Sequence, residues 1–176
     1  MDDAELVRLA QAGRRDAFDA IVLRHQQRVY QLCYRFVGNH EDATDLAQDV
    51  FVRAFRALGK FKGESAVGTW LHRIAVNVCL NRKAVKVPRL TPIEYVEPVD
   101  TRTERADAAI LRGERAVQVR AAVARLPPKQ RATLILRAYH DLPHEEIARI
   151  LGSSVGATKA NFFHALANLK RLMEST

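Results

Sequence analysis

Histidine is the residue type of this sequence best suited to proton transfer or metal binding, but the spacing of the six histidines argues against both roles. His140 and His144 are four residues apart, and Pro143 prevents one continuous helix from presenting both rings on the same face. His144-Glu145 starts a zinc-protease pattern, but the position that needs the second histidine is Ala148. The sequence also lacks a phosphate-binding glycine loop. We therefore predict that the protein has no catalytic site, metal or cofactor.

A pattern suited to binding DNA lies near the C-terminus. Residues 151–156 predict a tight turn between a short helix and a longer one, the outline of a helix-turn-helix in which Ser153 or Ser154 can cap the second helix. On that helix the spacing turns Lys159, Phe163 and Lys170 outward, with Asn161 and His164 on the flanks. The same spacing turns five residues inward: Val155, Phe162, Leu166, Leu169 and Leu172. Lysine can reach a phosphate or a guanine, asparagine can pair with adenine, and phenylalanine can contact a thymine methyl. An ordinary helical hairpin with a solvated lysine face is the alternative.

The segment 61–66, Phe-Lys-Gly-Glu-Ser-Ala, combines an aromatic ring, a cation, a glycine and small polar groups, and such a loop can receive an unstacked base. On the helix that follows it, a polar stripe recurs every four residues: Thr69, Arg73, Asn77 and Asn81. Asparagine gains little from a helix interior, so the stripe hints at a ligand. Trp70, on the opposite apolar face, is better explained as core packing.

A third stripe, Asp45, Asp49, Arg53 and Arg56, shares its helix with two apolar faces. One of these faces contains Leu46, Val50 and Ala54, and the other contains Phe51, Phe55 and Leu58. This is more apolar surface than one core contact needs, so part of it can meet another protein. The alternative is that a helical bundle buries both faces.

Helical spacing of apolar residues runs through most of the 176-residue chain, and no long alternating stretch predicts a strand. We expect an all-α protein with helices near 6–10, 18–36, 46–57, 67–78, 117–126, 129–139, 144–151 and 154–173. Cys33 and Cys79 lie inside apolar patterns and should be reduced core residues. The acidic start Met1-Asp2-Asp3 and the lack of a long apolar run predict a cytoplasmic protein without membrane insertion.

The helical pattern disappears between residues 87 and 108, where Pro88, Pro92 and Pro98 interrupt it. We predict domains at 1–86 and 109–176 joined by a flexible linker at 87–108. The net charges of the three segments in chain order are +4, −2 and +6, which account for the formal +8 of the chain. Two basic domains on a mildly acidic tether suit a protein that binds one polyanion at two places.

With these motifs laid out, the chain resembles the extracytoplasmic-function sigma factors of bacterial RNA polymerase. The resemblance rests on three stretches in the order expected for that family: Asp42 to Phe51; Phe61 through Thr69-Trp70-Leu71-His72-Arg73-Ile74-Ala75-Val76-Asn77; and Leu126 to Arg131 with Glu146-Ile147-Ala148 and Leu151-Gly152. The family has two helical domains, a region 2 bundle and a region 4 helix-turn-helix, joined by a flexible linker.

The resemblance implies a role for each group of residues. The β′ clamp helices of core RNA polymerase would be bound by Asp45, Gln48, Asp49, Phe51 and Arg53. The −10 promoter element would be captured and melted by Phe61, Lys62, Gly63, Glu64, Ser65, Ala66, Arg73, Asn77 and Asn81. The −35 element would be read by Ser154, Lys159, Ala160, Asn161, Phe163 and His164. The linker would enter the polymerase channels, region 4 would meet the β flap, and an anti-sigma factor would cover these faces.

The last helix departs from the usual family pattern, because Asn161 and His164 stand where arginines are expected, while Lys159 keeps a cation. We therefore expect a different −35 preference and a weaker grip on phosphate. Two other functions are open: a decoy that binds only an anti-sigma factor, and a stand-alone helix-turn-helix regulator. The first does not need the basic C-terminal domain, and the second leaves the N-terminal domain unused. An enzyme fits the sequence least well.

Overall fold

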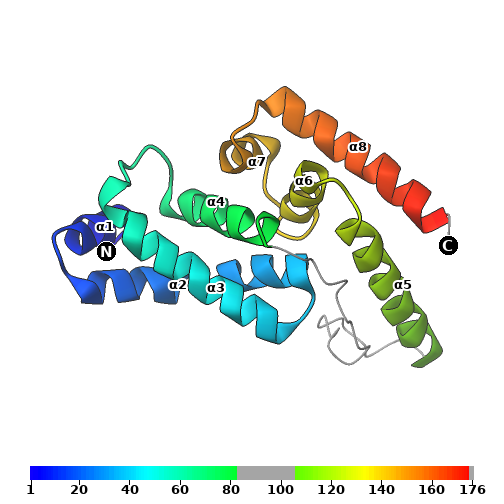
Figure 1. The fold of residues 1–176 in the computed structure, drawn as a ribbon, viewed down its shortest axis with the longest axis horizontal. Helices are drawn as coiled ribbons and strands as arrows, with labels where there is room; N and C mark the ends of the chain where they lie inside the picture. Colours follow the sequence, from blue (N-terminus) through cyan, green and yellow to red (C-terminus); the bar gives the residue numbers. More distant parts are fainter. Residues whose placement is uncertain (83–105, 175–176) are drawn as a thin grey trace.

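The computed structural model describes residues 1–82 and 106–174, and it describes side chains for 1–82 and 115–174. The described part consists of helices and connecting turns (Figure 1), as the apolar spacing predicts. The helices are α1 (Asp3–Gln11), α2 (Arg15–Val37), α3 (His40–Ala57), the 3-10 turn η1 (Leu58–Lys60), α4 (Val67–Leu80), α5 (Ala106–Ala124), α6 (Pro128–Ala138), α7 (His144–Leu151) and α8 (Val155–Glu174). No helix in the described ranges has the length and apolar character needed to cross a bilayer. Most of the predicted linker lies outside the described residues.

Local sequence signals account for where several helices begin and end. A capping box starts α1, in which the Asp2 carboxylate accepts from the backbone N–H of Glu5 at 2.9 Å. Helix α2 ends at Gly38, whose φ of 76° is the left-handed conformation that glycine adopts without strain. The Asn39 side chain then accepts from the backbone N–H of Asp42 at 2.8 Å and starts α3.

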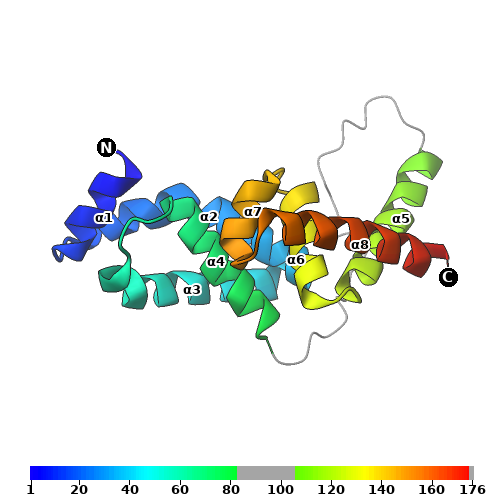
Figure 2. The same ribbon diagram turned by 90° about the horizontal axis from the view of Figure 1, so that it is seen from above.

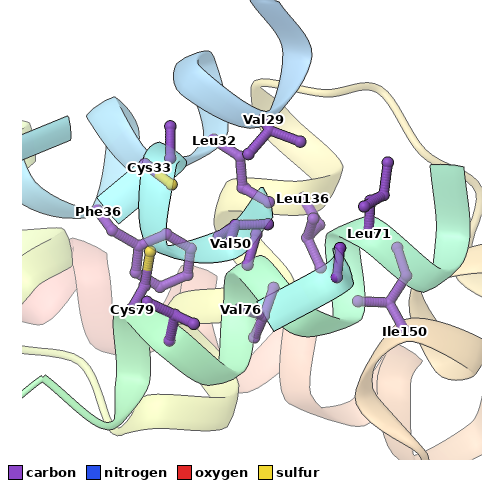
Figure 3. Close-up of a cluster of buried hydrophobic side chains, with 14 of the residues drawn as sticks. Val29, Leu32, Cys33, Phe36, Val50, Leu71, Val76, Cys79, Leu136 and Ile150 are labelled. Atoms are coloured by element: carbon purple, nitrogen blue, oxygen red, sulfur yellow. The ribbon is translucent and has the colours of Figure 1, made fainter. Parts of the chain in front are cut away.

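Helices α2, α3 and α4 pack together as a bundle, with α1 against α2. Its buried cluster includes Leu32, Val50 and Leu71 (Figure 3). Cys33 and Cys79 are both buried and free of disulfide bonds, as predicted. The hydrogen bond between the two thiols and their burial raise the pKa of Cys79 well above its usual range.

The C-terminal helices α6, α7 and α8 pack together, and α5 packs along α8. Helix α5 begins at Ala106, well before the helix expected from residue 117. The inward face of α8 also differs from the prediction. Thr158 and Ala165 are fully buried, whereas Leu166 is 44% exposed. The buried face of α8 therefore runs through Thr158, Phe162, Ala165, Leu169 and Leu172, and small residues provide its closest packing.

The N-terminal bundle and the C-terminal helices are in direct contact, and one buried cluster runs through both (Figure 3). Helix α4 packs on α7, and α2 packs on α6. Three guanidinium–aromatic pairs join the two parts: Arg35 over Tyr139 at 4.0 Å, Arg120 over Tyr34 at 5.0 Å and Arg131 over Phe36 at 5.2 Å. Distances below about 6 Å are in the range of favourable cation–π interactions. The Arg131 guanidinium also donates to the carbonyl oxygen of Phe36.

Candidate nucleic-acid interface

The start of the loop between η1 and α4 is tied to α1 by Gln11, a residue that sequence reasoning missed. The amide of Gln11, at the end of α1, donates to the carbonyl oxygens of Leu58 at 2.9 Å and Phe61 at 2.8 Å. Gly63, at the turn of the loop, has a φ of 74°, which a side chain would strain. Between α1 and the loop lies an open hollow of about 380 Å³, in the size range of small-ligand sites. The only sequence signal for Gln11 is its place at a helix end.

An aromatic pair stands where the loop meets α4. The rings of Phe61 and Trp70 lie 4.6 Å apart between centroids, tilted by 32°. They line a second open hollow of about 610 Å³ together with four exposed cations: Lys60, Lys62, Arg73 and Arg149. Trp70 is only partly buried, so it joins the core at one edge and the hollow at the other. Stacking surfaces beside cations are the elements from which single-strand binding sites are built.

The polar stripe of α4 divides into a covered half and an open half. Arg73, Asn77 and Asn81 are exposed, as expected for a face that meets a ligand. Thr69 is only 5% exposed where α7 packs on α4, and its hydroxyl donates to the carboxylate of Glu146 on α7. The Arg73 guanidinium donates to the carbonyl oxygen of Arg149, which also lies on α7. Sequence spacing predicts the stripe but not the helix that covers its first turns.

Two histidines lie side by side where α4 meets the C-terminal helices. The rings of His72 on α4 and His140 after α6 lie 5.9 Å apart between centroids, edge to face. Burial lowers the pKa of His72 from 6.5 to about 4, with a further contribution from the positive charge of Arg28. Burial and the neighbouring His72 lower the pKa of His140 to about 4 as well. Both rings are therefore neutral near pH 7.

The expected DNA-reading face of α8 is open. Lys159, Ala160 and His164 are exposed, Phe163 is 78% exposed, and Asn161 lies half-buried at the flank. Ser154 directly precedes the helix and caps it, because its hydroxyl accepts from the backbone N–H of Ala157 at 3.0 Å. Gly152 ends α7 with a φ of 64° and forms the turn between the two helices. These features form the predicted helix-turn-helix.

The same turn has the form Gly-x-Ser-x-Gly, from Gly152 to Gly156, which in some hydrolases presents a nucleophilic serine. That role requires a strand before the serine and a base beside it. Here a helix precedes Ser154, and its hydroxyl caps the next helix. Among the described residues, no group of three or more His, Cys, Asp or Glu is placed to hold a metal ion.

The predicted protein-binding stripe on α3 is mostly exposed. Asp45, Gln48 and Arg53 are open to solvent, and Arg53 pairs with the half-buried Asp49 at 3.1 Å. Phe51 is only 9% exposed and belongs to the bundle core, so it supports the helix from below. Phe55 remains 48% exposed and Val52 47%. The bundle therefore buries most of both apolar faces of α3, and an apolar strip remains on its surface.

Comparison with known proteins accounts for both parts of the chain. Residues 21–86 match the family model for sigma-70 region 2, and residues 116–169 match that for sigma-70 region 4. The ECF sigma factor SigM of Mycobacterium tuberculosis is 37% identical over 97% of this chain and 84% of its own length. This chain belongs to the extracytoplasmic-function (ECF) sigma factors.

A second relative and a solved structure support the same family assignment. The RNA polymerase sigma-H factor of Pseudomonas aeruginosa is 34% identical over 98% of this chain and 94% of its own length. Among solved structures, CnrH in complex with the cytosolic domain of CnrY has a TM-score of 0.70 at 28% identity, covering 98% of this chain and 97% of CnrH. As an ECF sigma factor, the chain directs promoter-specific initiation of transcription and is a regulatory subunit, not an enzyme. Helix α1, which supplies Gln11, precedes the region 2 match.

Proposed function

We propose that this sigma factor binds core RNA polymerase through α3 and reads its promoters with two separate surfaces. The exposed Asp45, Gln48 and the Asp49–Arg53 pair would meet the β′ clamp helices, with Phe51 holding the helix in place. Region 4 would contact the β flap. The predicted linker at 87–108 would enter the polymerase channels between them. The protein would act in the cytoplasm, with the polymerase.

The −10 element would be captured as a single strand by the loop 61–66. The observation that carries this proposal is the open loop itself, with the positive φ of Gly63, the two hollows beside it and the Phe61–Trp70 stack at its rim. A flipped base can stack on an aromatic ring or enter a hollow, while Lys62 and Arg73 neutralise its phosphates. Asn77 and Asn81, further along α4, would hold the strands apart.

The −35 element would be read as a duplex by the first turns of α8. Lys159 would contact a phosphate or guanine, Asn161 a base edge and Phe163 a thymine methyl, with Ser154, Ala160 and His164 at the border. Two weak contacts joined by a tether bind together far more tightly than either alone. We also propose that an anti-sigma factor of unknown identity regulates the protein, since members of the family are usually held in that way.

The experiment that tests the function is run-off transcription with core RNA polymerase on a fragmented genomic library, with and without this protein. New discrete start sites that share two upstream elements are expected, and their alignment gives both recognition sequences. No gain of start sites and no binding to core polymerase would refute the proposal. Tight binding to duplex DNA without polymerase would then favour a stand-alone regulator, and binding only to an anti-sigma factor would favour a decoy.

A further inference from the structure

Helix α1 lies beside η1 and the start of the loop 61–66, although it precedes the part of the chain that matches region 2 (Figures 1 and 2). The side-chain amide nitrogen of Gln11 donates to the carbonyl oxygens of Leu58 at 2.9 Å and Phe61 at 2.8 Å, and two hydrogens are all that it has to give. Leu58 is buried in the bundle core, whereas the ring of Phe61 packs on Trp70. Gln11 therefore fixes the backbone where the chain leaves the core and enters the loop.

The other end of α1 is tied to α2. The Asp3 carboxylate pairs with the Arg24 guanidinium at 3.1 Å and lies 2.9 Å from a ring nitrogen of His25. Between the two ends, Leu6 and Val7 are buried in the core of the bundle. Because α1 is held at both ends and along its apolar face, it is a fixed support for the loop and not a loose N-terminal arm.

The hollow of about 380 Å³ has α1 as one wall and the loop as the other. Arg8 and Gln11 line it from α1, and Lys62 lines it from the loop. Asp3 is the one carboxylate along this lining in the described part of the chain, and its pairing with Arg24 offsets its charge. The exposed cations Arg8 and Lys62 therefore stand on opposite walls of the hollow. A nucleotide, with a flat polar base and a negative phosphate, fits such a lining.

We propose that α1 takes part in −10 recognition: Gln11 is a positioning residue that sets the shape of the loop 61–66, and Arg8 contacts the nucleotide that the loop captures. The inference rests on the proposed capture of a −10 base by that loop and adds a second wall to the site. A guanidinium donates to a base edge or to a phosphate oxygen, and the loop holds the nucleotide against Arg8 only while its start stays tied to α1. Part of the promoter specificity then lies outside the segment that matches region 2.

The test is a double-mutant cycle between α1 and one nucleotide, made with the full-length protein bound to core RNA polymerase. The probe is a forked promoter fragment found by run-off transcription, in which the −10 non-template strand is unpaired. Each −10 position in turn is replaced by an abasic site, and the position at which wild type loses most affinity marks the captured base. The cycle separates an effect on that base from a general loss of structure, because unrelated losses add.

The two variants on α1 are Gln11→Met, which keeps the length of the side chain but cannot donate, and Arg8→Gln, which removes the charge. Each is expected to bind the intact fork about fivefold to tenfold more weakly than wild type, the effect of one or two lost hydrogen bonds. On the fork without the captured base, each should differ from wild type by less than about twofold. The matched controls, Gln27→Met and Arg15→Gln, change exposed side chains of α2 that do not line the hollow and should bind both forks like wild type.

Equal losses on the intact and the abasic fork would overturn the inference, because the variants would then act on the structure of region 2 and not on the captured base. The absence of any loss on the intact fork would overturn it as well. If no abasic position weakens binding of the wild type, the proposed base capture itself fails, and the role of α1 fails with it.

The proximity of α1 to the strand is measured separately, with both polar residues left in place. Ala4 is exposed and lines the hollow, whereas Ala12, just past the end of α1, is exposed but does not line it. A benzophenone side chain at position 4 is expected to cross-link to the −10 non-template strand at or next to the captured base, and one at position 12 is not. No cross-link from position 4, or equal cross-linking from both positions, would place the strand away from α1 and overturn the inference.

Discussion

In the loop 61–66, which is proposed to capture the −10 element, single residues act through backbone geometry as well as through charge. Gly63 has a φ of 74°, and a Cβ there would meet no atom within 4 Å, so any effect of alanine comes from the backbone alone. The left-handed conformation costs a residue with a side chain about 1 kcal/mol. The shape of the loop, and with it base capture, is therefore expected to respond to this one substitution.

We predict that Gly63→Ala lowers open-complex formation about fivefold, the equivalent of about 1 kcal/mol at 25 °C. Permanganate footprinting of the melted −10 region measures the effect. The matched control is Gly59→Ala, which also meets no atom within 4 Å but has no positive φ. The explanation is wrong if the two variants melt the promoter equally well.

The two cysteines are expected to be chemically silent in the folded protein. Both side chains are buried, and the hydrogen bond to Cys33 together with burial raises the pKa of Cys79, so Cys79 does not form a reactive thiolate. We predict that a thiol reagent modifies them more than about 100-fold more slowly than in urea, since reaction requires opening of the bundle. An added exposed thiol, Glu41→Cys, reports the uninhibited rate. Rapid modification of both native thiols would contradict their placement.

At the scale of the element, α8 concentrates the departures from the usual family pattern. Lys159 is the exposed cation in its first turns, and Lys170 is an exposed cation about three turns further on. Removing a single contact between a cation and a phosphate lowers the salt dependence of binding by about one unit of slope. Lys159→Ala should therefore reduce the slope for −35 duplex binding by about one, and Lys170→Ala by much less. Equal slopes would move the DNA contact away from the N-terminal half of α8.

Helix positions could be predicted from the sequence because apolar spacing and caps are local signals. The spacing found α2, α3, α4 and the α7–α8 turn, and it correctly turned Lys159 and Phe163 outward. It failed where packing depends on another element. Ala165 and Thr158, not Leu166, lie against the core because close helix packing favours small residues. Phe51, which the family resemblance places at the polymerase contact, is 9% exposed, and its role there stays a prediction.

At the scale of the whole molecule, the sequence holds no signal for how the two parts meet. Thr69 and Glu146 are 77 residues apart, and no periodicity connects them. The contact depends on groups that look like ordinary helix residues when read alone: a threonine in a polar stripe, a histidine on an apolar face and an arginine near a helix end. Only their meeting buries Thr69, at the start of the polar stripe on α4.

The histidine pair makes the closed arrangement, in which the two parts are in contact, sensitive to pH. Burial lowers the pKa values of His72 and His140 to about 4, and Arg28, Arg35 and His25 add positive charge around the two rings, against the carboxylate of Glu146 beside His72. In an open molecule both rings would titrate near their ordinary 6.5. Below pH 6.5 the open state therefore binds more protons than the closed one, and acid favours opening. Their contribution to closure is complete above about pH 7 and is lost as pH falls towards 4.

We predict that the free protein opens between pH 7 and pH 5, with each ring weakening closure by about 1–2 kcal/mol at pH 5. The separation of the two parts is measured by energy transfer between dyes attached at Glu41→Cys and Lys170→Cys, one exposed position in each part. The native cysteines are buried and therefore should not react with the dyes. The double variant His72→Asn/His140→Asn removes both titrating groups and should lose the pH response. Energy transfer that stays constant across this range, or that changes equally in the double variant, would contradict the prediction. In either case protonation of His72 and His140 would have no effect on closure.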